Sequence, residues 1–383
     1  MIQIWGNDMK KILVIYASAG DGHKKAAEAI YKSLLYYKAD VLVMPIDSLN
    51  YTTRFFKFFY KRTYIIMIKK FPWLWGFFYR LLNIRFFFVL ASLFRMIANI
   101  ANSKRLAKFL RAENFDVIVS THFFAPYIIS RLKKKGLIKS RLINVITDFM
   151  PHLYWISDCV DIYTVAANET ALGLENMGVT REKIMPLGIP VRKQFLTVTL
   201  KQQARARLGL DSGRFTILMM RGGLGVGPVI QILKRLRALT FNLQVIVVCG
   251  HNTALRSQVS AVDMGPGKNI QVTGFSHDVA QLMAASDIMV SKAGGITVAE
   301  ALSIGLPIIC FNPIPGQEQA NALFLTENNI GFKAKTLNDI NAIIENVRHN
   351  PASCNELEKR IRQAGKPSAA IDIAGLALGM LKR

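Results

Sequence analysis

The sequence lacks any long run of apolar residues. A helix that crosses a membrane needs about 18 or more consecutive residues almost free of charge, and no window of the chain meets that requirement. The nearest approach, Phe86 to Phe94, is closed by Arg85 and Arg95. Residues 1–8 also lack the basic and apolar segments of a signal peptide, and the first strand-like run follows Met9. We therefore expect a chain that does not cross a membrane.

Cysteine is scarce as well. The chain has four cysteines far apart in the sequence, and no two of them form a CxxC pair: Cys159, Cys249, Cys310 and Cys354. Cys249 and Cys310 lie inside apolar runs and are expected to be small buried thiols. This usage is typical of a protein in a reducing cytosol.

Familiar phosphate-binding motifs are missing. The chain contains no Asp-x-Asp motif, with which some sugar transferases hold a diphosphate through a metal ion. The glycine-rich run after Met220 has neither the GxGxxG spacing of a dinucleotide fingerprint nor the Gly-Lys-Ser/Thr of a Walker A loop. We therefore expect no metal site and no cofactor. A departing diphosphate would instead be met by helix N–H groups and a basic residue.

Acidic residues are absent from one long segment. Between Tyr51 and Arg111 the chain has thirteen Lys or Arg residues and no Asp or Glu, within a protein of formal net charge +24. The segment also carries dense aromatic clusters, such as Phe-Phe-Lys-Phe-Phe-Tyr at 55–60. Aromatic and basic residues mixed on a helix are typical of a segment in the interface of an anionic membrane. A buried helix pair with a basic outer face and a surface that stacks nucleic-acid bases are the alternatives. The clustering of the aromatic residues favours lipid, and we expect no nucleic-acid partner.

Most of the remaining sequence alternates between short apolar runs and helix-like stretches. This pattern predicts an α/β protein with parallel sheets covered on both faces. A chain of 383 residues is too long for one ordinary core, so two domains are expected. The expected strands are 12–16, 41–44, 117–120 and 141–147 in the first half, and 216–220, 245–249, 270–272, 288–290 and 308–311 in the second.

The expected domain boundaries follow from composition. The first domain spans 9–191 and contains the basic aromatic segment 51–111. The second domain spans 192–366 and begins with a polar segment rich in Lys and Arg. Residues 367–383 have helical composition and are expected to form a crossover helix that packs back on the first domain.

The first candidate catalytic residue is His23. It ends the loop Ala17-Ser-Ala-Gly-Asp-Gly-His23, between the first strand and a helix expected at 24–37. A histidine at the carboxyl edge of a sheet can take the proton of an attacking hydroxyl when its pKa lies near the working pH. The alternative is a histidine with a purely structural hydrogen bond at a helix N-terminus.

Other polar and aromatic residues follow two further strands. His122 comes directly after 117–120, and Asp148, His152 and Trp155 lie at or just beyond the end of 141–147. The carboxyl ends of parallel strands share one edge of a sheet, so these side chains can meet near His23. They are candidates for binding an acceptor or orienting His23, and a role in local folding is the alternative for each.

The second half carries the pattern of a donor site. Gly294 and Gly295 form a turn between an apolar run and a helix, whose first N–H groups can bind a diphosphate. Glu300, one turn into that helix, can accept hydrogen bonds from two ribose hydroxyls. Gln317 and Glu318 offer amide and carboxylate groups for sugar hydroxyls.

Three other features complete the expected donor site. The glycines of the run after Met220 let backbone amides approach a phosphate or sugar closely. Arg192, which follows Gly188-Ile-Pro-Val191, is the candidate cation for the departing diphosphate. The remaining donor-binding candidates are Gly222, Gly223, Gly225 and Ser291.

Taken in order, the motifs resemble the monogalactosyldiacylglycerol synthase and processive diacylglycerol glucosyltransferase family, a group similar to glycosyltransferase family 28. The resemblance covers nearly the whole chain, and the second half is similar to the relative that adds N-acetylglucosamine to a peptidoglycan lipid precursor. It implies the GT-B architecture, with two Rossmann-like domains that face an interdomain cleft. The matching motifs are the loop ending at His23, Thr147-Asp148, Gly188-Ile-Pro-Val-Arg192, Gly274-Phe-Ser-His-Asp278, Gly294-Gly295…Glu300 and Pro315-Gly-Gln-Glu-Gln-Ala-Asn321.

The resemblance also implies roles for individual residues. His23 matches the family's proposed base or its helper, and Glu300 would hold the ribose. Arg192 would assist at the diphosphate, and Gln317 with Glu318 would read the sugar. The uracil would be flanked by Phe275 and Ser276, and the diphosphate would be lined by Gly294, Gly295, Ile296 and Thr297.

The resulting hypothesis is an inverting, metal-independent glycosyltransferase. It would move a hexose, glucose or galactose, from a UDP-sugar to diacylglycerol, as a peripheral protein at the cytoplasmic face of the cell membrane. His23 would deprotonate the acceptor hydroxyl and Asp148 would orient or balance that step. Two alternatives remain: a transferase acting on another membrane lipid, such as an undecaprenyl carrier, and a non-catalytic membrane-bound sensor of UDP-sugars.

Overall fold

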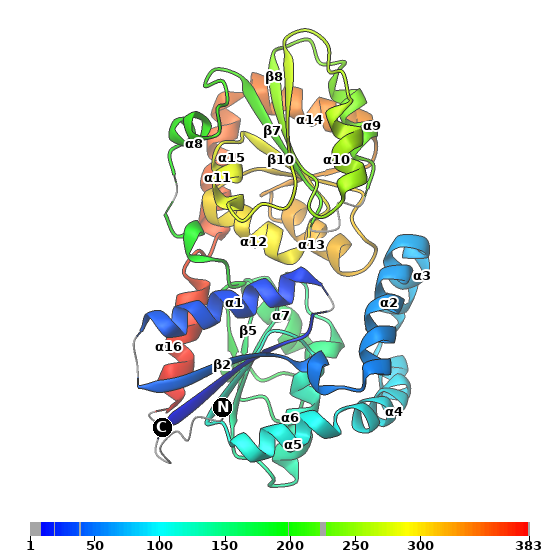
Figure 1. Ribbon diagram of the computed structural model, residues 1–383, viewed down its shortest axis with the longest axis vertical. Coiled ribbons are helices and arrows are strands. Elements are labelled where there is room, and N and C mark those ends of the chain that lie inside the picture. Colours follow the sequence, from blue (N-terminus) through cyan, green and yellow to red (C-terminus); the bar gives the residue numbers. More distant parts are fainter. Residues whose placement is uncertain (1–8, 19, 38–39, 198, 223–226, 382–383) are drawn as a thin grey trace. The chain divides into compact units, whose positions relative to one another are not determined.

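The structure is a computed structural model that describes residues 9–18, 20–37, 40–197, 199–222 and 227–381. The chain divides into two compact units. The first unit contains Met1–Lys193 together with Ser368–Arg383, and the second contains Gln194–Pro367. Each unit is built around one sheet of six strands whose pairings are all parallel (Figure 1).

The sheet of the first unit has the strand order β2-β1-β3-β4-β5-β6. Its central strands are continuous apolar runs because both faces are covered by helices. The edge strand β2 passes through Pro45, which an edge position tolerates because the missing N–H faces away from the ladder. The strands are β1 (Lys10–Tyr16), β2 (Val41–Asp47), β3 (Val117–Ser120), β4 (Arg141–Val145), β5 (Ile162–Thr164) and β6 (Ile184–Met185).

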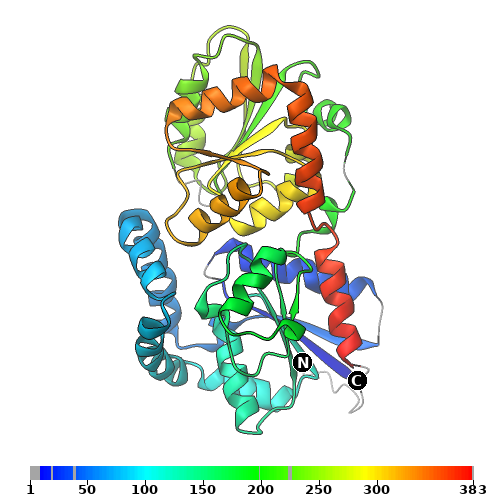
Figure 2. The same cartoon turned by 180° about the vertical axis from the view of Figure 1, so that it is seen from behind.

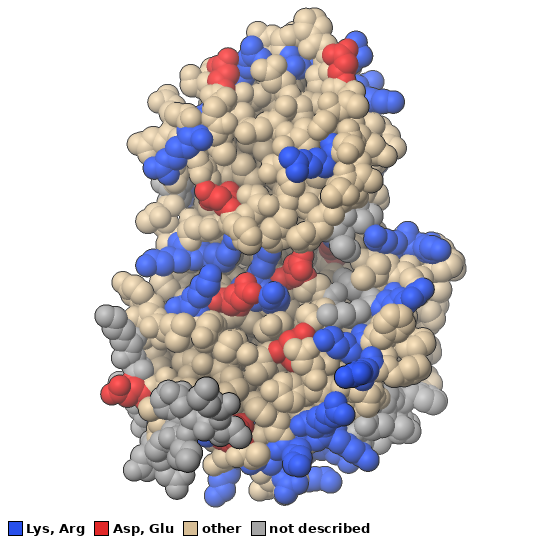
Figure 3. Space-filling view, viewed as in Figure 1, with Lys and Arg blue, Asp and Glu red and all other residues tan. Residues whose placement is uncertain are grey.

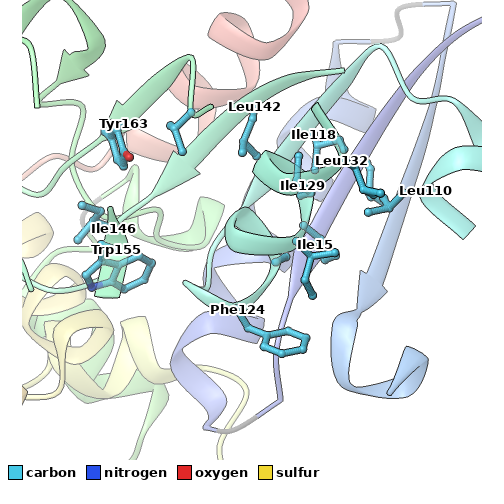
Figure 4. Close-up of a cluster of buried hydrophobic side chains, with 14 of the residues drawn as sticks. Ile15, Leu110, Ile118, Phe124, Ile129, Leu132, Leu142, Ile146, Trp155 and Tyr163 are labelled. Atoms are coloured by element: carbon cyan, nitrogen blue, oxygen red, sulfur yellow. The ribbon is translucent and has the colours of Figure 1, made fainter. Parts of the chain in front are cut away.

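Two helical layers cover this sheet. On one face, α1 (Asp21–Tyr36) and α16 (Ala369–Leu381) pack side by side and bury Ile12, Val14 and Ile143 (Figure 2). On the other face lie α5 (Lys104–Glu113), α6 (Phe124–Lys134) and α7 (Asn168–Asn176). Figure 4 shows this second layer, where side chains of β1, β3 and β4 meet those of α5 and α6. Thus α16, from the end of the chain, completes the core of the first unit.

The basic aromatic segment forms three helices outside the sheet layers. They are α2 (Arg54–Lys70), α3 (Pro72–Leu81) and α4 (Arg85–Asn102). Many of their large apolar side chains are exposed, including Phe55, Trp73 and Phe86 at 71%, 68% and 73%. Figure 3 shows Lys and Arg side chains along the flank that α2 to α5 form. The alternative of an ordinary buried helix pair does not fit the exposed aromatic side chains described for this segment.

No single helix in the described part of the chain is both long and apolar enough to cross a membrane. One pair passes the length and composition test together, namely Pro72–Leu81 with Arg85–Ser92, and the two helices are bent by 99° at their junction.

The sheet of the second unit has the order β12-β11-β10-β7-β8-β9. One face is covered by α9, α10 and α14, whose apolar side chains pack on β7, β8 and β10. The strands are β7 (Phe215–Met220), β8 (Leu243–Val248), β9 (Lys268–Thr273), β10 (Ile288–Ser291), β11 (Ile308–Phe311) and β12 (Phe332–Ala334). The helices are α8 (Lys201–Arg207), α9 (Val229–Leu236), α10 (Thr253–Ser260), α11 (Val279–Ala284), α12 (Gly295–Ile304), α13 (Gln317–Glu327), α14 (Leu337–His349) and α15 (Pro351–Ala364). Short 3-10 turns are η1 (Ser48–Tyr51), η2 (Leu153–Trp155), η3 (Arg181–Lys183) and η4 (Lys193–Phe195).

The expected α/β class with parallel sheets is confirmed, with three strands that the sequence pattern missed. These are β5, β6 and β12, which have only three, two and three residues. Runs that short cannot show a period, so local composition does not reveal them. The strand expected at 141–147 ends two residues earlier, at Val145, which leaves Thr147 and Asp148 in the segment beyond the sheet.

The glycine that ends α15 fixes how closely that helix approaches α12. A Cβ atom on Gly365 would lie 2.4 Å from the carbonyl oxygen and 2.8 Å from the carbonyl carbon of Leu302. Both atoms belong to a helix backbone and cannot rotate away. We therefore expect Gly365→Ala to lower the free energy of unfolding of the second unit by about 1–3 kcal/mol, measured by urea denaturation.

The matched control is Gly379→Ala in α16, where an added Cβ meets nothing within 4 Å. Replacing a helical glycine by alanine there should raise stability by up to about 1 kcal/mol. Equal denaturation midpoints for the two variants would contradict the close approach of α15 to α12.

Candidate active site

The functional side chains of the first unit gather at the carboxyl edge of its sheet. The strand order reverses between β1 and β3, and open α/β sheets bind ligands at such a switch point. His23 follows β1, while Thr121 and His122 follow β3. Thr147, beyond β4, reaches the same place, because its hydroxyl lies 3.1 Å from the His23 ring.

His23 lies in the first turn of α1 and not in the loop before that helix, so the expected helix start was three residues too late. The helix begins at Asp21 because an acidic residue favours a first helical turn. The ring nitrogen Nδ1 lies 2.7 Å from the carbonyl oxygen of Thr121. A carbonyl can only accept a hydrogen bond, so Nδ1 carries the proton and Nε2 keeps a free lone pair. His23 is therefore held in the tautomer that can take a proton through Nε2.

Burial lowers the pKa of His23 to about 4, and the hydrogen bond to Thr121 opposes this shift only in part. The expectation of a pKa near the working pH is therefore wrong. The imidazole is neutral across the whole neutral pH range, so the proton-accepting form needs no prior deprotonation.

His122 is packed directly against His23. The two ring centroids are 4.6 Å apart in an edge-on arrangement, and His122 is 2% exposed. Its Nδ1 accepts a hydrogen bond of 3.1 Å from the N–H of Phe124, which places the proton of the neutral ring on Nε2. Burial and the neighbouring His23 lower the pKa of His122 well below its usual value. Acceptor binding by His122 stays a prediction. In the neutral ring, Nε2–H is the group that can donate a hydrogen bond to an acceptor.

His152 connects the exposed helices to the loop beyond β4. Its Nε2 donates to the Tyr79 carbonyl of α3 at 2.8 Å, and its Nδ1 accepts from the N–H of Tyr154 at 3.1 Å. Leu153 N–H also donates to Asn83 at 3.0 Å. With both ring nitrogens used inside the protein, this geometry favours a structural role for His152. Its predicted contact with an acceptor remains untested.

Trp155 and Asp148 occupy the same loop. The Trp155 ring is 3% exposed and its centroid lies 6.0 Å from that of His23, so it forms one wall around the imidazole. Asp148 is 7% exposed, and its charge contributes to raising the pKa of Tyr79. The described hydrogen-bond partners of His23 Nδ1 are the Thr121 carbonyl, which accepts, and the Thr147 hydroxyl. An orienting role of Asp148 stays a prediction.

The loop that leads to His23 is fixed by a residue that the sequence did not single out. Asp47, at the end of β2, accepts hydrogen bonds from the Ser18 N–H at 3.2 Å, from the Ser18 hydroxyl, and from the Leu49 N–H at 3.0 Å. It therefore anchors the chain between β1 and α1. The sequence feature that could have identified Asp47 is its position as a carboxylate at the carboxyl end of an apolar strand.

The carboxyl edge of the second sheet also has a switch point, between β7 and β10. Arg221 and Gly222 follow β7, and the Gly294 turn follows β10. Arg221 is 3% exposed and donates to the carbonyls of Phe311 at 2.9 Å and Asn312 at 3.2 Å, which ties the edge of β7 to that of β11. Gly222 has φ +75°, while the predicted Gly223 and Gly225 lie outside the described residues.

The start of α12 has the geometry expected of a diphosphate site. Gly294 is the N-cap of the helix Gly295–Ile304, and as a glycine it has no side chain that could cap the first N–H groups. Ile296 and Thr297 lie in that first turn. Ser291 is buried and donates its hydroxyl to the Met220 carbonyl at 2.9 Å, so it joins β10 to β7. Diphosphate binding by this turn stays a prediction.

Glu300 is 1% exposed within α12. Gln317 is half-buried at the first position of α13. Glu318 is held by the protein itself, with Oε1 2.7 Å from Lys292 Nζ and Oε2 accepting from the Ile314 N–H at 2.9 Å. The sequence missed Lys292, although it follows the apolar run of β10 directly. Ribose and sugar binding by these groups stay predictions.

The base end of the expected donor site lies beyond β8 and β9. The Phe275 ring is 39% exposed and stacks on His251, with centroids 4.5 Å apart and planes at 14°. Ser276 accepts a hydrogen bond from the Asp278 N–H at 3.2 Å. An exposed aromatic stack can continue onto a flat base. Arg192, the predicted cation for the diphosphate, belongs to the first unit.

Two family models match the chain in sequence order. Residues 23–191 match the model described as monogalactosyldiacylglycerol (MGDG) synthase, and residues 227–373 match the glycosyltransferase family 28 C-terminal domain. Similar curated proteins are processive diacylglycerol beta-glucosyltransferases. The one from Bacillus pumilus (strain SAFR-032) is 27% identical over 370 residues, covering 93% of this chain and 91% of that protein. The one from Bacillus subtilis (strain 168) is 27% identical over 376 residues, with the same coverage of 93% and 91%.

Solved structures share the fold. MurG of Acinetobacter baumannii has a TM-score of 0.62 at 17% identity, covering 97% of this chain and 99% of that one. Anabaena Alr3699/HepE in complex with UDP-glucose has a TM-score of 0.57 at 14% identity, covering 96% and 99%. This likeness confirms the GT-B fold class expected from the sequence.

Proposed function

We propose that this chain, in which a monogalactosyldiacylglycerol synthase domain precedes a glycosyltransferase family 28 C-terminal domain, transfers a hexose from a UDP-sugar to diacylglycerol. The observation that supports this most is the match to diacylglycerol glucosyltransferases over more than nine-tenths of the chain. His23, with Nε2 free to accept a proton, supplies the group that such a transfer needs.

In the proposed reaction, the acceptor hydroxyl of diacylglycerol attacks the anomeric carbon of the sugar. The hydroxyl proton passes to Nε2 of His23 as the new carbon–oxygen bond forms. The bond between the anomeric carbon and the β-phosphate oxygen breaks, and UDP leaves with both electrons. Attack from the face opposite UDP inverts the anomeric configuration.

The second unit would hold the donor. The N–H groups at the start of α12 carry the positive end of the helix dipole and suit the diphosphate charge that grows as UDP leaves. Phe275 would stack on the uracil, Glu300 would hold the ribose, and Glu318 with Gln317 would bind the sugar.

The exposed face of α2, α3 and α4 would bind an anionic membrane surface and bring the enzyme to its lipid acceptor. Exposed aromatic rings next to Arg54, Lys57 and Arg62 support this proposal, because such side chains suit the interface between headgroups and acyl chains. The four cysteines are free thiols, which fits attachment to the cytoplasmic face of the membrane.

The direct test supplies radiolabelled UDP-glucose, UDP-galactose or UDP-N-acetylglucosamine to the full chain with diacylglycerol vesicles. We expect a labelled glycolipid with at least one of the two hexose donors. An undecaprenyl carrier is added in competition with diacylglycerol, and the lipid that receives the label is the preferred acceptor. Binding of a donor without any labelled product would contradict an enzymatic function and favour a sensor of UDP-sugars.

The pH dependence follows from the pKa of His23, which is about 4 in the folded chain against 6.5 in an unfolded one. Between these values the unfolded chain binds more protons, so stability falls as the pH drops from 6.5 towards 4. His122 acts in the same direction. We expect a lower melting temperature near pH 5 than near pH 7, and an acid limb of kcat/KM below pH 5. An acid limb centred near pH 6.5 would contradict the buried, neutral state of His23.

A further inference from the structure

Lys292 has no part in the reaction proposed above, yet it forms an ion pair with Glu318, the carboxylate that is proposed to bind the sugar. Its Nζ lies 2.7 Å from Glu318 Oε1, and the two side chains are only 23% and 7% exposed. The second oxygen, Oε2, is held by the Ile314 N–H at 2.9 Å. In the ligand-free protein both oxygens of Glu318 are therefore bound by protein groups.

The ion pair lies next to two glycines of the donor site. A Cβ atom on Gly294 would be 3.9 Å from Glu318 Oε1. A Cβ atom on Gly222 would be 3.3 Å from Cε and 3.9 Å from Nζ of Lys292. These glycines mark the N-terminus of α12 and the start of the loop after β7, the two places where backbone can approach a phosphate.

Around Glu318 two positively charged side chains face one carboxylate. Lys292 and the buried guanidinium of Arg221 both lie near Glu318, whose charge opposes the lowering of the Arg221 pKa by burial. A diphosphate at the start of α12 adds negative charge beside the Glu318 carboxylate. The negative charges of the diphosphate and of the Glu318 carboxylate repel each other unless a cation lies between them. Lys292, on a flexible four-carbon stem, is the cation in place to do so.

We propose that Lys292 exchanges partners when the donor binds, and thereby makes sugar recognition depend on the diphosphate. Its ammonium leaves Glu318 Oε1 for the diphosphate oxygens. The freed Oε1 then accepts a hydrogen bond from a sugar hydroxyl, while Oε2 stays on the Ile314 N–H. Lys292 is a positioning and specificity residue in this exchange, which rests on the proposed function because its ligand is a UDP-sugar.

The test is a double-mutant cycle by calorimetry, with UDP and UDP-glucose as probes on the full chain. Lys292→Gln should weaken UDP binding by about tenfold or more, because a charge-assisted contact is lost. Glu318→Gln should tighten UDP binding several-fold, because the ammonium no longer has a carboxylate to leave. Glu318→Gln should also remove most of the additional affinity that UDP-glucose has over UDP.

The decisive measurement is the effect of Glu318→Gln in the Lys292→Gln background. There the substitution relieves only the repulsion between the carboxylate and the diphosphate, so UDP affinity should rise less than in the wild-type background. Weaker UDP binding by Glu318→Gln alone, or an equal change in both backgrounds, overturns the exchange. Lys292→Arg keeps the charge and should retain most of the UDP affinity. Lys359→Gln, on the exposed face of α15, is the charge-matched control, and thermal unfolding shows that each variant is folded.

The outcomes separate this inference from the proposed function. A chain that binds UDP-glucose and shows the cycle but forms no glycolipid contradicts the transferase and supports the exchange. A wild-type chain that binds neither UDP nor UDP-glucose overturns both.

Discussion

We expect His23→Gln to lower kcat for glycolipid formation by about 10²–10⁴-fold, the usual contribution of a general base. Glutamine can still donate an amide hydrogen to the Thr121 carbonyl, the partner that now holds Nδ1 at 2.7 Å. It has no group that takes a proton at neutral pH, so the variant keeps the local structure and loses the base. UDP affinity should stay unchanged, because the proposed reaction gives His23 a contact with the acceptor hydroxyl and none with UDP.

The measurement is initial-rate transfer of labelled sugar to diacylglycerol vesicles, with calorimetric UDP binding alongside. His349→Gln, an exposed histidine at the end of α14, is the matched control and should keep wild-type kcat. Full activity of His23→Gln would remove His23 as the base. Loss of UDP binding together with activity would point to misfolding and not to catalysis.

We expect the neutralisation of Arg54, Lys57 and Arg62 together to lower the affinity for anionic vesicles by about 10²-fold, since each basic residue near such a surface contributes about 1 kcal/mol. These three residues lie on α2 around an apolar hollow of ≈ 590 Å³ that also includes Phe58, Ile65 and Ile66. The control neutralises three exposed lysines of the second unit: Lys234, Lys335 and Lys359. Both triple variants lose equal charge, so only the position of the charge differs between them.

Vesicle co-sedimentation at two salt concentrations separates the two contributions to binding. The Arg54/Lys57/Arg62 variant should lose the part of binding that salt screens. A Trp73→Ser and Phe86→Ser variant should lose the part that salt does not screen, because both rings are exposed and apolar. Equal vesicle binding by the two charge variants would contradict a membrane surface on α2. Salt-sensitive binding to RNA without binding to vesicles would replace it by a nucleic-acid surface.

Much of the fold is readable from the sequence because its central strands are buried on both faces. Apolar runs such as 117–120 and 308–311 coincide with β3 and β11 at both ends. The start of α1 was misjudged because two glycines obscured the helical composition around Asp21. The sequence pattern thus predicts the fold class more accurately than it predicts the ends of individual helices and strands.

Candidate site residues can be found in the sequence where the side-chain type itself indicates a function. They cannot be found where a backbone carbonyl or N–H group makes the contact. The glycine turn at Gly294 and the histidine at position 23 are visible in the sequence. The Thr121 carbonyl that sets the tautomer of His23 has no residue-type signature, since every residue has a carbonyl. The pairing of Lys292 with Glu318 joins positions 26 residues apart, and only the approach of β10 to α13 brings them together.

The hydrogen bonds from His152 to Tyr79 and from Leu153 to Asn83 limit which segments of the first unit can be exchanged independently. They join the outer helices to the loop that also carries Trp155, the neighbour of His23. A graft that exchanged 54–102 with a relative's segment would keep a backbone carbonyl at position 79, but it would lose the bond to Leu153 wherever position 83 is not Asn. The outer helices and the loop are therefore joined by hydrogen bonds, and we expect a graft that keeps activity to carry 148–155 along with 54–102.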